Sequence, residues 1–178
     1  FTRFSDKPAE GQEIASNLAD LYIQLGDLEG AMPLLERLIA WPGIQANPDV
    51  LANARYNLAQ VEITRGNAER ARELFDAAQA YWASEPARHG VMLSESRGLQ
   101  ARFLRMERRF DEAIAILEAR IGERRRLAGD DREVVLAING LVLALLEAGR
   151  YEDAIAKANE GLALAERLDE RHLTFGLM

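Results

Sequence analysis

Three pairs of neighbouring acidic residues are the first side chains in this sequence that could do chemistry. Two adjacent carboxylates can bind a metal ion or exchange a proton. The pairs are Asp111-Glu112, Asp130-Asp131 and Glu152-Asp153. Two of them begin predicted helices and the third lies at a joint between helices, where negative charge stabilises the free N–H groups of a first turn. We therefore interpret all three pairs as structural.

The two histidines offer little more for catalysis or metal binding. His89 and His172 are far apart in sequence, and both fall in segments predicted to join helices, so an isolated surface histidine is expected at each. The sequence contains no HExxH, GxSxG, GxxxxGK[ST] or GxGxxG motif. We predict that the chain is not an enzyme and that it has no catalytic residue, no metal site and no cofactor.

The charge of the chain argues against nucleic acid as a direct partner. Arg120 and the run 123–126 (ERRR) form a basic segment without interleaved aromatic residues, and we interpret it as a solvated helix end. The chain has 22 basic and 29 acidic residues, a net charge of −7. Broad electrostatic capture of DNA or of an anionic membrane is therefore not expected, although a local basic patch stays open.

Composition and length favour a cytoplasmic helical protein. Of the 178 residues 48% are hydrophobic, and there is no cysteine, so neither a disulfide framework nor a thiolate metal site can form. The longest nearly unbroken apolar run, 134–146, is thirteen residues, short of the about 20 that span a membrane. The sequence begins with Phe1 and has no signal-peptide layout. We expect it to be a piece of a longer protein, or to lack a leader.

One turn phrase returns four times along the chain and predicts how the helices are arranged. It begins at residues 25, 65, 107 and 148 as LGDLEGA, RGNAERA, ERRFDEA and AGRYEDA, at steps of 40, 42 and 41 residues. Each copy separates two segments whose apolar residues recur three and four positions apart, the period of an amphipathic helix. The sequence thus predicts four helical hairpins and no strand.

The residues of the phrase explain how each hairpin turns. Glycine suits the left-handed conformation that ends a helix, and it is present in three copies, at Gly26, Gly66 and Gly149. Asp27 and Asn67 are predicted to cap the following helix. The third copy has Arg108-Arg109 instead of glycine, so we expect its helix to end in a looser or differently shaped turn. A small residue that lets two helices approach closely recurs at Ala31, Ala71, Ala113 and Ala154.

These residues resemble the tetratricopeptide repeat. Residues 17–38 match its pattern of large, small, aromatic, glycine and alanine positions, the second and fourth copies follow with substitutions such as Glu62, and the third is degenerate. The resemblance covers roughly residues 12–168. The period is longer than the usual about 34 residues, with the extra residues expected in joints at 41–50, 82–90 and 124–133. Such long repeats are similar to the kinesin-light-chain type and to those of bacterial signalling proteins.

The resemblance implies an all-α fold, an α–α superhelix. We expect residues 1–178 to form a single solenoid of four stacked hairpins plus the start of a fifth helix pair. The repeats are expected at about 12–45, 52–85, 94–127 and 135–168, with 169–178 beginning a further or capping helix.

In this family the first helix of each repeat lines a concave groove that can hold a peptide. Counting by the family register gives the lining residues of this chain. They are Ser16, Asp20, Ile23, Tyr56, Gln60, Ile63, Gly98, Arg102, Arg105, Asn139, Leu143 and Leu146. Asn57 joins them, because an asparagine near this position holds the ligand backbone in peptide-binding members. A hydrogen bond within the fold is the alternative role for Asn57.

Two features of this groove leave alternatives open. Arg102, Arg105 and Arg109 form a basic stripe that would pair with an acidic partner, or would be balanced by Glu107 and other nearby acids. The helix 133–148 is apolar nearly all round, so it should be buried on more than one side while Leu143 and Leu146 still face the groove. A bound peptide would cover these two leucines, and so would residues 169–178 of the same chain.

The leading hypothesis is a protein–protein interaction scaffold that binds a peptide or partner segment in its groove. The resemblance further implies the regulatory or sensor part of a larger bacterial protein. The alternative is a structural module that forms a homo-oligomer, or packs within its own polypeptide, through the apolar C-terminal helix.

Overall fold

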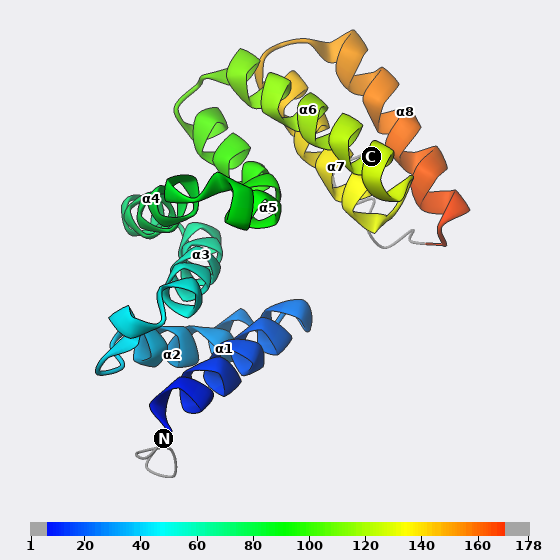
Figure 1. Cartoon of the computed structure of the whole chain (residues 1–178). Helices are drawn as coiled ribbons and strands as arrows, with labels where there is room; N and C mark the ends of the chain where they lie inside the picture. The colour runs from blue at the N-terminus through cyan, green and yellow to red at the C-terminus, as the bar shows by residue number, and fades with distance from the viewer. Residues whose placement is uncertain (1–6, 170–178) are drawn as a thin grey trace. The chain divides into compact units, whose positions relative to one another are not determined.

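The structure is a computed structural model, and it describes residues 7–169 (Figure 1). These residues form eight α-helices and one 3-10 helix, with no strand among them. The helices are α1 (Pro8–Gln24), α2 (Leu28–Ile39), η2 (Ile44–Ala46), α3 (Pro48–Thr64), α4 (Ala68–Ser84), α5 (Pro86–Met106), α6 (Phe110–Ala128), α7 (Arg132–Glu147) and α8 (Tyr151–Arg167). The predicted all-α fold of helical hairpins is confirmed.

The chain divides within α5 into two compact units, Phe1–Leu93 and Ser94–Met178. In the first unit α1 packs on α2, α2 on α3 and α3 on α4, and α1 also contacts α3. Its main core joins alanines of α1 and α2 to leucines of α2 and α3, including Leu35, Leu38 and Leu58. A smaller cluster surrounds Trp82, whose ring meets that of Tyr56 edge-on at 5.5 Å.

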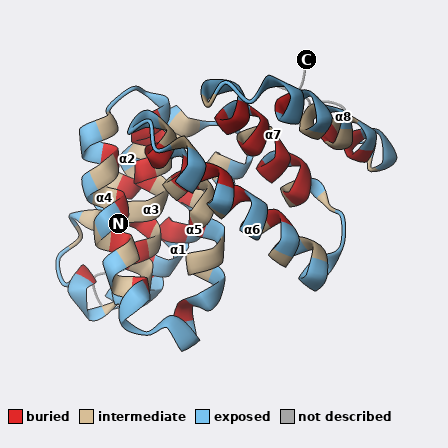
Figure 2. Ribbon diagram, turned by 90° about the horizontal axis from the view of Figure 1, so that it is seen from above, coloured by how far each residue is buried: buried red, intermediate tan, exposed pale blue. Residues whose placement is uncertain are grey.

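The second unit is built around α7. This helix packs against both α6 and α8, and residues of α5 such as Ala101 and Leu104 complete the core. Eight of the sixteen residues of α7 are buried, and its ribbon is largely red in Figure 2. The prediction that this helix is buried on more than one side is confirmed.

The repeat is long because its helices are long. We expected the extra residues in joints at 82–90 and 124–133, and the structure extends helices into both: α4 continues to Ser84, α5 begins at Pro86, and α6 runs to Ala128. Proline is well suited to a first helical turn, where its missing N–H has no partner to lose. At His89 the backbone leaves helical geometry (φ −106°, ψ 18°) and α5 is kinked. Only the first joint holds a separate element, η2.

All four hairpin turns have one shape, which corrects the expectation for the third. In each turn, the second residue after the helix donates to the carbonyl three positions back, and the next residue donates to the carbonyl five positions back. In the first turn these bonds are Gly26 N–H to Ile23 O (2.9 Å) and Asp27 N–H to Tyr22 O (2.9 Å). The third turn makes the same pair of bonds at 2.9 and 2.8 Å, with Arg108 at φ 60°. Arg108 thus adopts the left-handed conformation of this turn although it is not glycine.

The caps agree with the sequence in part. Asp27 accepts a hydrogen bond from the Gly30 N–H at 2.8 Å, as predicted. Asn67 makes no such bond, so the predicted cap is wrong there. Its side chain donates instead to Glu62 at 2.6 Å, because the carboxylate of Glu62 is 1% exposed and needs donors. Arg70 supplies a second donor to Glu62 at 2.9 Å. The four alanines of the phrase are all buried, which confirms close packing there.

We expect Arg108→Gly to stabilise the second unit by about 0.5–1 kcal/mol, because an L side chain at positive φ is strained. Gly149→Ala, at φ 75°, should destabilise it by a similar or larger amount. Urea denaturation followed by circular dichroism measures both changes. Loss of stability in Arg108→Gly would mean that the stacking of Arg108 on Phe110, at 5.7 Å, outweighs the strain.

Removing Arg70 should leave the buried Glu62 with Asn67 as its remaining side-chain donor. We expect Arg70→Ala to cost about 1–3 kcal/mol in the free energy of unfolding. The double variant Arg70→Ala with Glu62→Gln should recover part of that loss, since it removes the uncompensated charge. Additive losses in a double-mutant cycle would contradict this coupling.

Candidate partner-binding surface

Each unit places the first helices of two successive repeats side by side. In the first unit α1 contacts α3, and the side chain of Asn57 in α3 donates to Asp20 in α1. In the second unit Arg105 of α5 forms a two-bond ion pair with Glu147 of α7, at 2.8 and 2.6 Å. The residues predicted to bind a partner therefore fall into two groups, one on each unit.

In the first unit the predicted residues form a connected polar row, which we call the amide ladder: Asp20, Asn57 and Gln60. Besides its bond to Asp20, Asn57 accepts from the Gln60 side chain at 3.2 Å. Burial raises the pKa of the Asp20 carboxyl, and the hydrogen bond from Asn57 only partly offsets that effect. Asn57 thus has the internal role that the sequence left as an alternative, while the ladder remains half-buried.

The other predicted residues of this unit differ in exposure. Tyr56 is half-buried against Trp82, and Ile23 is half-buried against the core. Ser16 and Ile63, which we expected to line the surface, are instead buried, at 6% and 4% exposure. For Ile63 the reason is that α3 is covered by α1, α2 and α4, so few of its sides stay open.

In the second unit the basic stripe is largely neutralised within the chain. Arg105 is paired with Glu147, and this hydrogen bond lowers the pKa of the Glu147 carboxyl. Arg109 pairs with Glu112 at 2.7 Å and with Glu107 at 3.0 Å. Arg102 is exposed, and its pKa is lowered by partial burial and by the charge of Arg105. The sequence left two roles open for the basic stripe, contact with an acidic partner or balance by nearby acidic residues. Arg105 and Arg109 have the second role.

Apolar side chains adjoin this stripe on α7. Leu143 and Leu146, which we expected to face the groove, are 38% and 41% exposed. Leu136, 36% exposed, belongs to the same row and was missed, although its spacing of seven and ten residues could have identified it. Asn139 is half-buried between them, and Gly98 is half-buried on α5. The proposed covering segment lies, beyond Asp169, outside the described residues.

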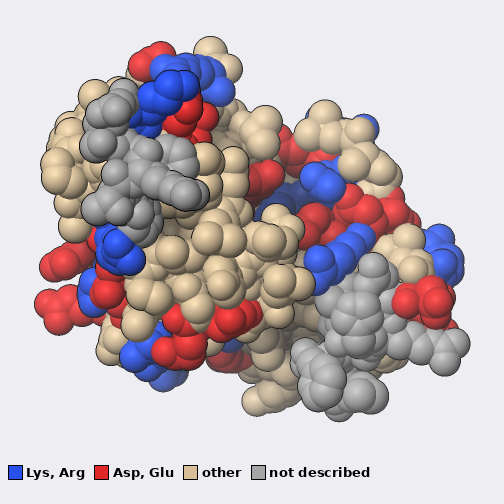
Figure 3. Space-filling model, turned by 90° about the horizontal axis from the view of Figure 1, so that it is seen from below, with Lys and Arg blue, Asp and Glu red and all other residues tan. Residues whose placement is uncertain are grey.

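The acidic pair Asp130-Asp131 forms ion pairs with arginines of the basic run. Asp131 caps α7 through the Val134 N–H at 3.1 Å and pairs with Arg124, as its cap role predicted. Asp130 pairs with Arg125 and Arg167, and the hydrogen bond from Arg125 lowers the pKa of its carboxyl. Figure 3 shows basic and acidic side chains intermingled on one face of the molecule. Within residues 7–169, no three His, Asp or Glu side chains are placed to hold a metal ion.

His89 corrects the expectation of a surface histidine. It is 6% exposed, its ring lies 4.9 Å from that of Tyr81, and its Nε2 is 3.7 Å from Asp49 Oδ1. It is buried because α5 begins directly after α4 and turns its first residues onto the core around Trp82. His172 lies outside the described residues. None of the helices among them is long and apolar enough to cross a membrane.

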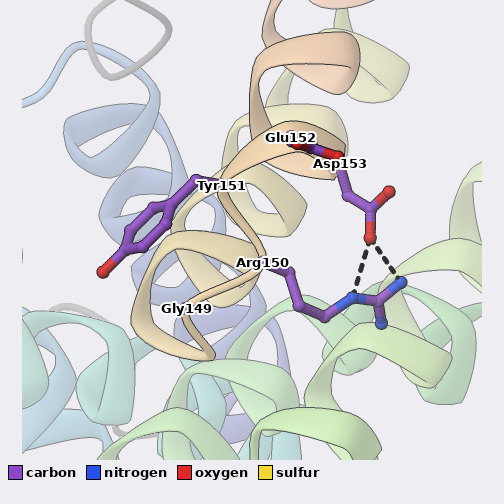
Figure 4. Close-up of a pocket in the computed structure, with 5 residues that line it drawn as sticks. All are labelled: Gly149, Arg150, Tyr151, Glu152 and Asp153. Atoms are coloured by element: carbon purple, nitrogen blue, oxygen red, sulfur yellow. Dashed lines mark hydrogen bonds and ion pairs between the residues drawn. The ribbon is translucent and has the colours of Figure 1, made fainter.

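A shallow hollow lies at the turn between α7 and α8 and contains none of the residues predicted to bind a partner (Figure 4). It is lined by Gly149, Arg150, Tyr151, Glu152 and Asp153. Arg150 and Asp153 pair with each other at 2.8 Å, and Tyr151 points away from that pair. The hollow is one copy of the recurring hairpin turn and offers a ligand little beyond an exposed ion pair.

Comparison with known protein families decides the nature of the first two hairpins. Family models described as tetratricopeptide repeat match residues 13–42 and 44–86, which hold α1–α2 and η2–α4. Residues 13–86 are tetratricopeptide repeats. The later hairpins continue the same arrangement of helices and turns, with the third turn's Arg108 in place of glycine. A comparison with curated proteins finds no match.

Solved structures of tetratricopeptide-like repeats share the fold over nearly the whole chain. BtubC (BKLC) from P. vanneervenii matches with a TM-score of 0.71 and 20% identity, over 99% of this chain and 75% of BtubC. A protein from Podosopora anserina, described as a kinesin light chain with nearly identical TPR-like repeats, matches with a TM-score of 0.60 and 21% identity, over 92% of this chain and 78% of that one. The resemblance to long repeats of the kinesin-light-chain type is confirmed at the level of fold.

The raised pKa of Asp20 predicts how stability depends on pH. Because the carboxyl binds its proton more tightly in the folded state, ionising it costs stability as pH rises through the folded-state pKa. We expect Asp20→Asn to be more stable than the parent at pH 7, by no more than about 1 kcal/mol, and to lose this advantage below about pH 4. Urea denaturation across this range measures the difference. A variant that is less stable at every pH would contradict the assignment.

Proposed function

We propose that the chain is a protein–protein interaction module that binds a segment of its partner along the paired first helices of each unit. Tetratricopeptide repeats generally mediate protein–protein interaction, and residues 13–86 are such repeats. The residues we assign to partner binding are Asp20, Ile23, Tyr56, Asn57, Gln60, Arg102, Arg105, Asn139, Leu143 and Leu146.

The observation that carries the proposal is the amide ladder. Side-chain amides can both donate to and accept from a peptide backbone, and three such residues of α3 share one face at a spacing of four and three: Asn53, Asn57 and Gln60. Asn53 Oδ1 is buried and accepts no hydrogen bond from the described residues. Because that oxygen is buried, the half-buried amides of Asn57 and Gln60 are the groups that a bound segment could reach.

The electrostatics of the ladder suggest what the segment carries. Asp20 is held partly desolvated, with Asn57 as its hydrogen-bond donor. A lysine or arginine side chain placed against it would favour the charged carboxylate and recover the cost of its burial. We therefore expect a basic residue in the part of the partner that contacts the first unit.

The surface of the second unit suits different chemistry. Arg102, Leu143 and Leu146 are exposed on the first helices of that unit. An amphipathic segment could lay apolar side chains on the leucines and an acidic one against Arg102. The resemblance also implies a continuous solenoid through all four repeats and a place in a larger bacterial regulatory protein. Both stay predictions.

A peptide-display selection against the whole chain tests this function. Peptides enriched by the parent should bind the Gln60→Ala and Asn57→Ala variants more weakly, by up to about tenfold for a lost hydrogen bond. Gln45→Ala, at an exposed glutamine of η2, is the matched control and should bind as the parent does. Enriched peptides that bind all of these variants equally would overturn the assignment of the ladder.

A further inference from the structure

The side chain of Arg120 reaches from the second helix α6 onto the first helix α5 at Gly98. A Cβ atom at Gly98 would lie 2.6 Å from Arg120 Nη1, so the guanidinium group occupies the space that any other side chain at this position would need. Gly98 shares one side of α5 with Arg102 and Arg105, at a spacing of four and three residues. A second helix thus supplies a charged group to the side of the first helix that we assign to partner binding.

Arg120 and Gly98 are both exceptions among the four repeats. The steps of the recurring turn phrase identify the residues at the equivalent positions of the other repeats. The position of Arg120 is buried and uncharged in each of them, and the position of Gly98 carries a side chain. These residues are Leu38, Ala78 and Gly161 for Arg120, and Ser16, Tyr56 and Asn139 for Gly98. An arginine in a buried packing position needs a way out to solvent for its charge, and the glycine at 98 provides it.

The guanidinium group of Arg120 has few hydrogen-bond partners for its burial. Its side chain is 18% exposed, and within residues 7–169 it donates one hydrogen bond, from Nη2 to Glu133 of α7 at 3.2 Å. Arg105, with the same 18% exposure, donates two, to Glu147 at 2.8 and 2.6 Å. A guanidinium group has five N–H donors, and a largely buried charge is costly when few of them are used. Arg120 therefore has donors left for a ligand, those of Nη1 above Gly98 among them.

We propose that Arg120 binds the carboxylate of an acidic side chain in the partner segment, and that it makes the second unit specific for an acidic segment. This inference rests on the proposed function, to which it adds a residue and a ligand group. The planar guanidinium group matches a carboxylate with two parallel hydrogen bonds, a geometry that lysine does not reproduce. In the free protein Glu133 fills part of this role with its single long bond, and the partner's carboxylate would replace it.

The charge along this side of α5 favours an anion. Partial burial lowers the pKa of Arg102, and the positive charge of Arg105 lowers it further. Positive charges on this side therefore destabilise one another, and Arg120 adds a guanidinium group one turn before Arg102. A carboxylate bound here would reduce that repulsion. A basic or an apolar segment would gain nothing from Arg120, so this residue discriminates between partners by charge.

Peptide-display selection on the parent, Arg120→Met and Arg126→Met chains tests the proposal. Methionine is unbranched like the arginine stem but has no charge and no N–H donor, and Arg126 is an exposed arginine of the same helix. Peptides enriched by the parent and by Arg126→Met should share an Asp or Glu at one position, and this preference should be lost on Arg120→Met. A parent peptide, synthesised with an amidated C-terminus so that only side chains supply carboxylates, should bind Arg120→Met roughly ten- to a hundredfold more weakly.

Replacing Glu133 separates a binding role of Arg120 from a structural one. Arg120→Met and Glu133→Gln both break the ion pair between α6 and α7. If the pair served only to join these helices, both variants would weaken peptide binding to the same extent, and that result overturns the proposal. We expect Glu133→Gln to bind the peptide at least as tightly as the parent, because the guanidinium group is freed for the ligand.

Circular dichroism confirms that each variant is folded. Arg120→Lys keeps the charge but loses the two-bond geometry, and it replaces Arg120→Met if that variant is unfolded.

Gly98→Ala tests the position of the guanidinium group without removing its charge. The added methyl group would meet Nη1 at the end of a flexible side chain, so the guanidinium group must move while the helix is little affected. We expect severalfold weaker peptide binding and unchanged stability to urea. Enriched peptides that bind the parent, Arg120→Met and Gly98→Ala equally, but still depend on Gln60, overturn this inference and leave the proposed function intact. A chain that enriches no peptide overturns both.

Discussion

A helical hairpin has two apolar sides and can bury only one of them by folding on itself. The second must be covered by another hairpin, and this requirement governs each unit of the structure. It explains why α3 and α7, which have helices on several sides, each contain eight buried residues, more than any other described helix. It also explains the conserved geometry of the four turns. A helix that ended differently would place the next one out of reach of the buried alanines.

The same requirement separates the surfaces that remain. A first helix has three sides: one in the core, one against the preceding hairpin, and one left for contacts between first helices. In the first unit the third side holds the amide ladder, and in the second it holds Arg102 and the exposed leucines of α7. The second side of α1 carries Ile14, Leu18 and Leu21, which are exposed. Side chains can therefore differ from one repeat to the next on the surfaces that stacking does not bury, and we expect binding residues there.

Several of the charged residues form ion pairs at the joints between helices. We interpreted the basic run 123–126 as a solvated helix end, and in the structure Arg124 and Arg125 pair with acidic residues of the next joint and of α8. Glu62 shows the cost of a departure within a repeat. It stands where the first repeat has Tyr22, and it is buried. The side chains of Asn67 and Arg70 both contact it, and Asn67 does not cap α4. Such compensation is local, so it leaves the hairpin geometry unchanged.

The sequence by itself determined the helices, their turns and their small packing residues. These follow from periodicity, from glycine at positive φ and from alanine in register, all of which act over a few neighbouring residues. The family register assigned Leu143 and Leu146 to the groove, and both are exposed in the structure. The sequence did not predict the conformation, burial or hydrogen bonding of residues whose contacts come from distant parts of the chain. Only the tertiary structure decided that Arg108 would take a glycine's conformation, that Ile63 and His89 would be buried, and that Asn57 would be bonded to Asp20. These outcomes depend on which helix lies opposite, and the periodicity of one helix carries no information about its neighbour's side chains.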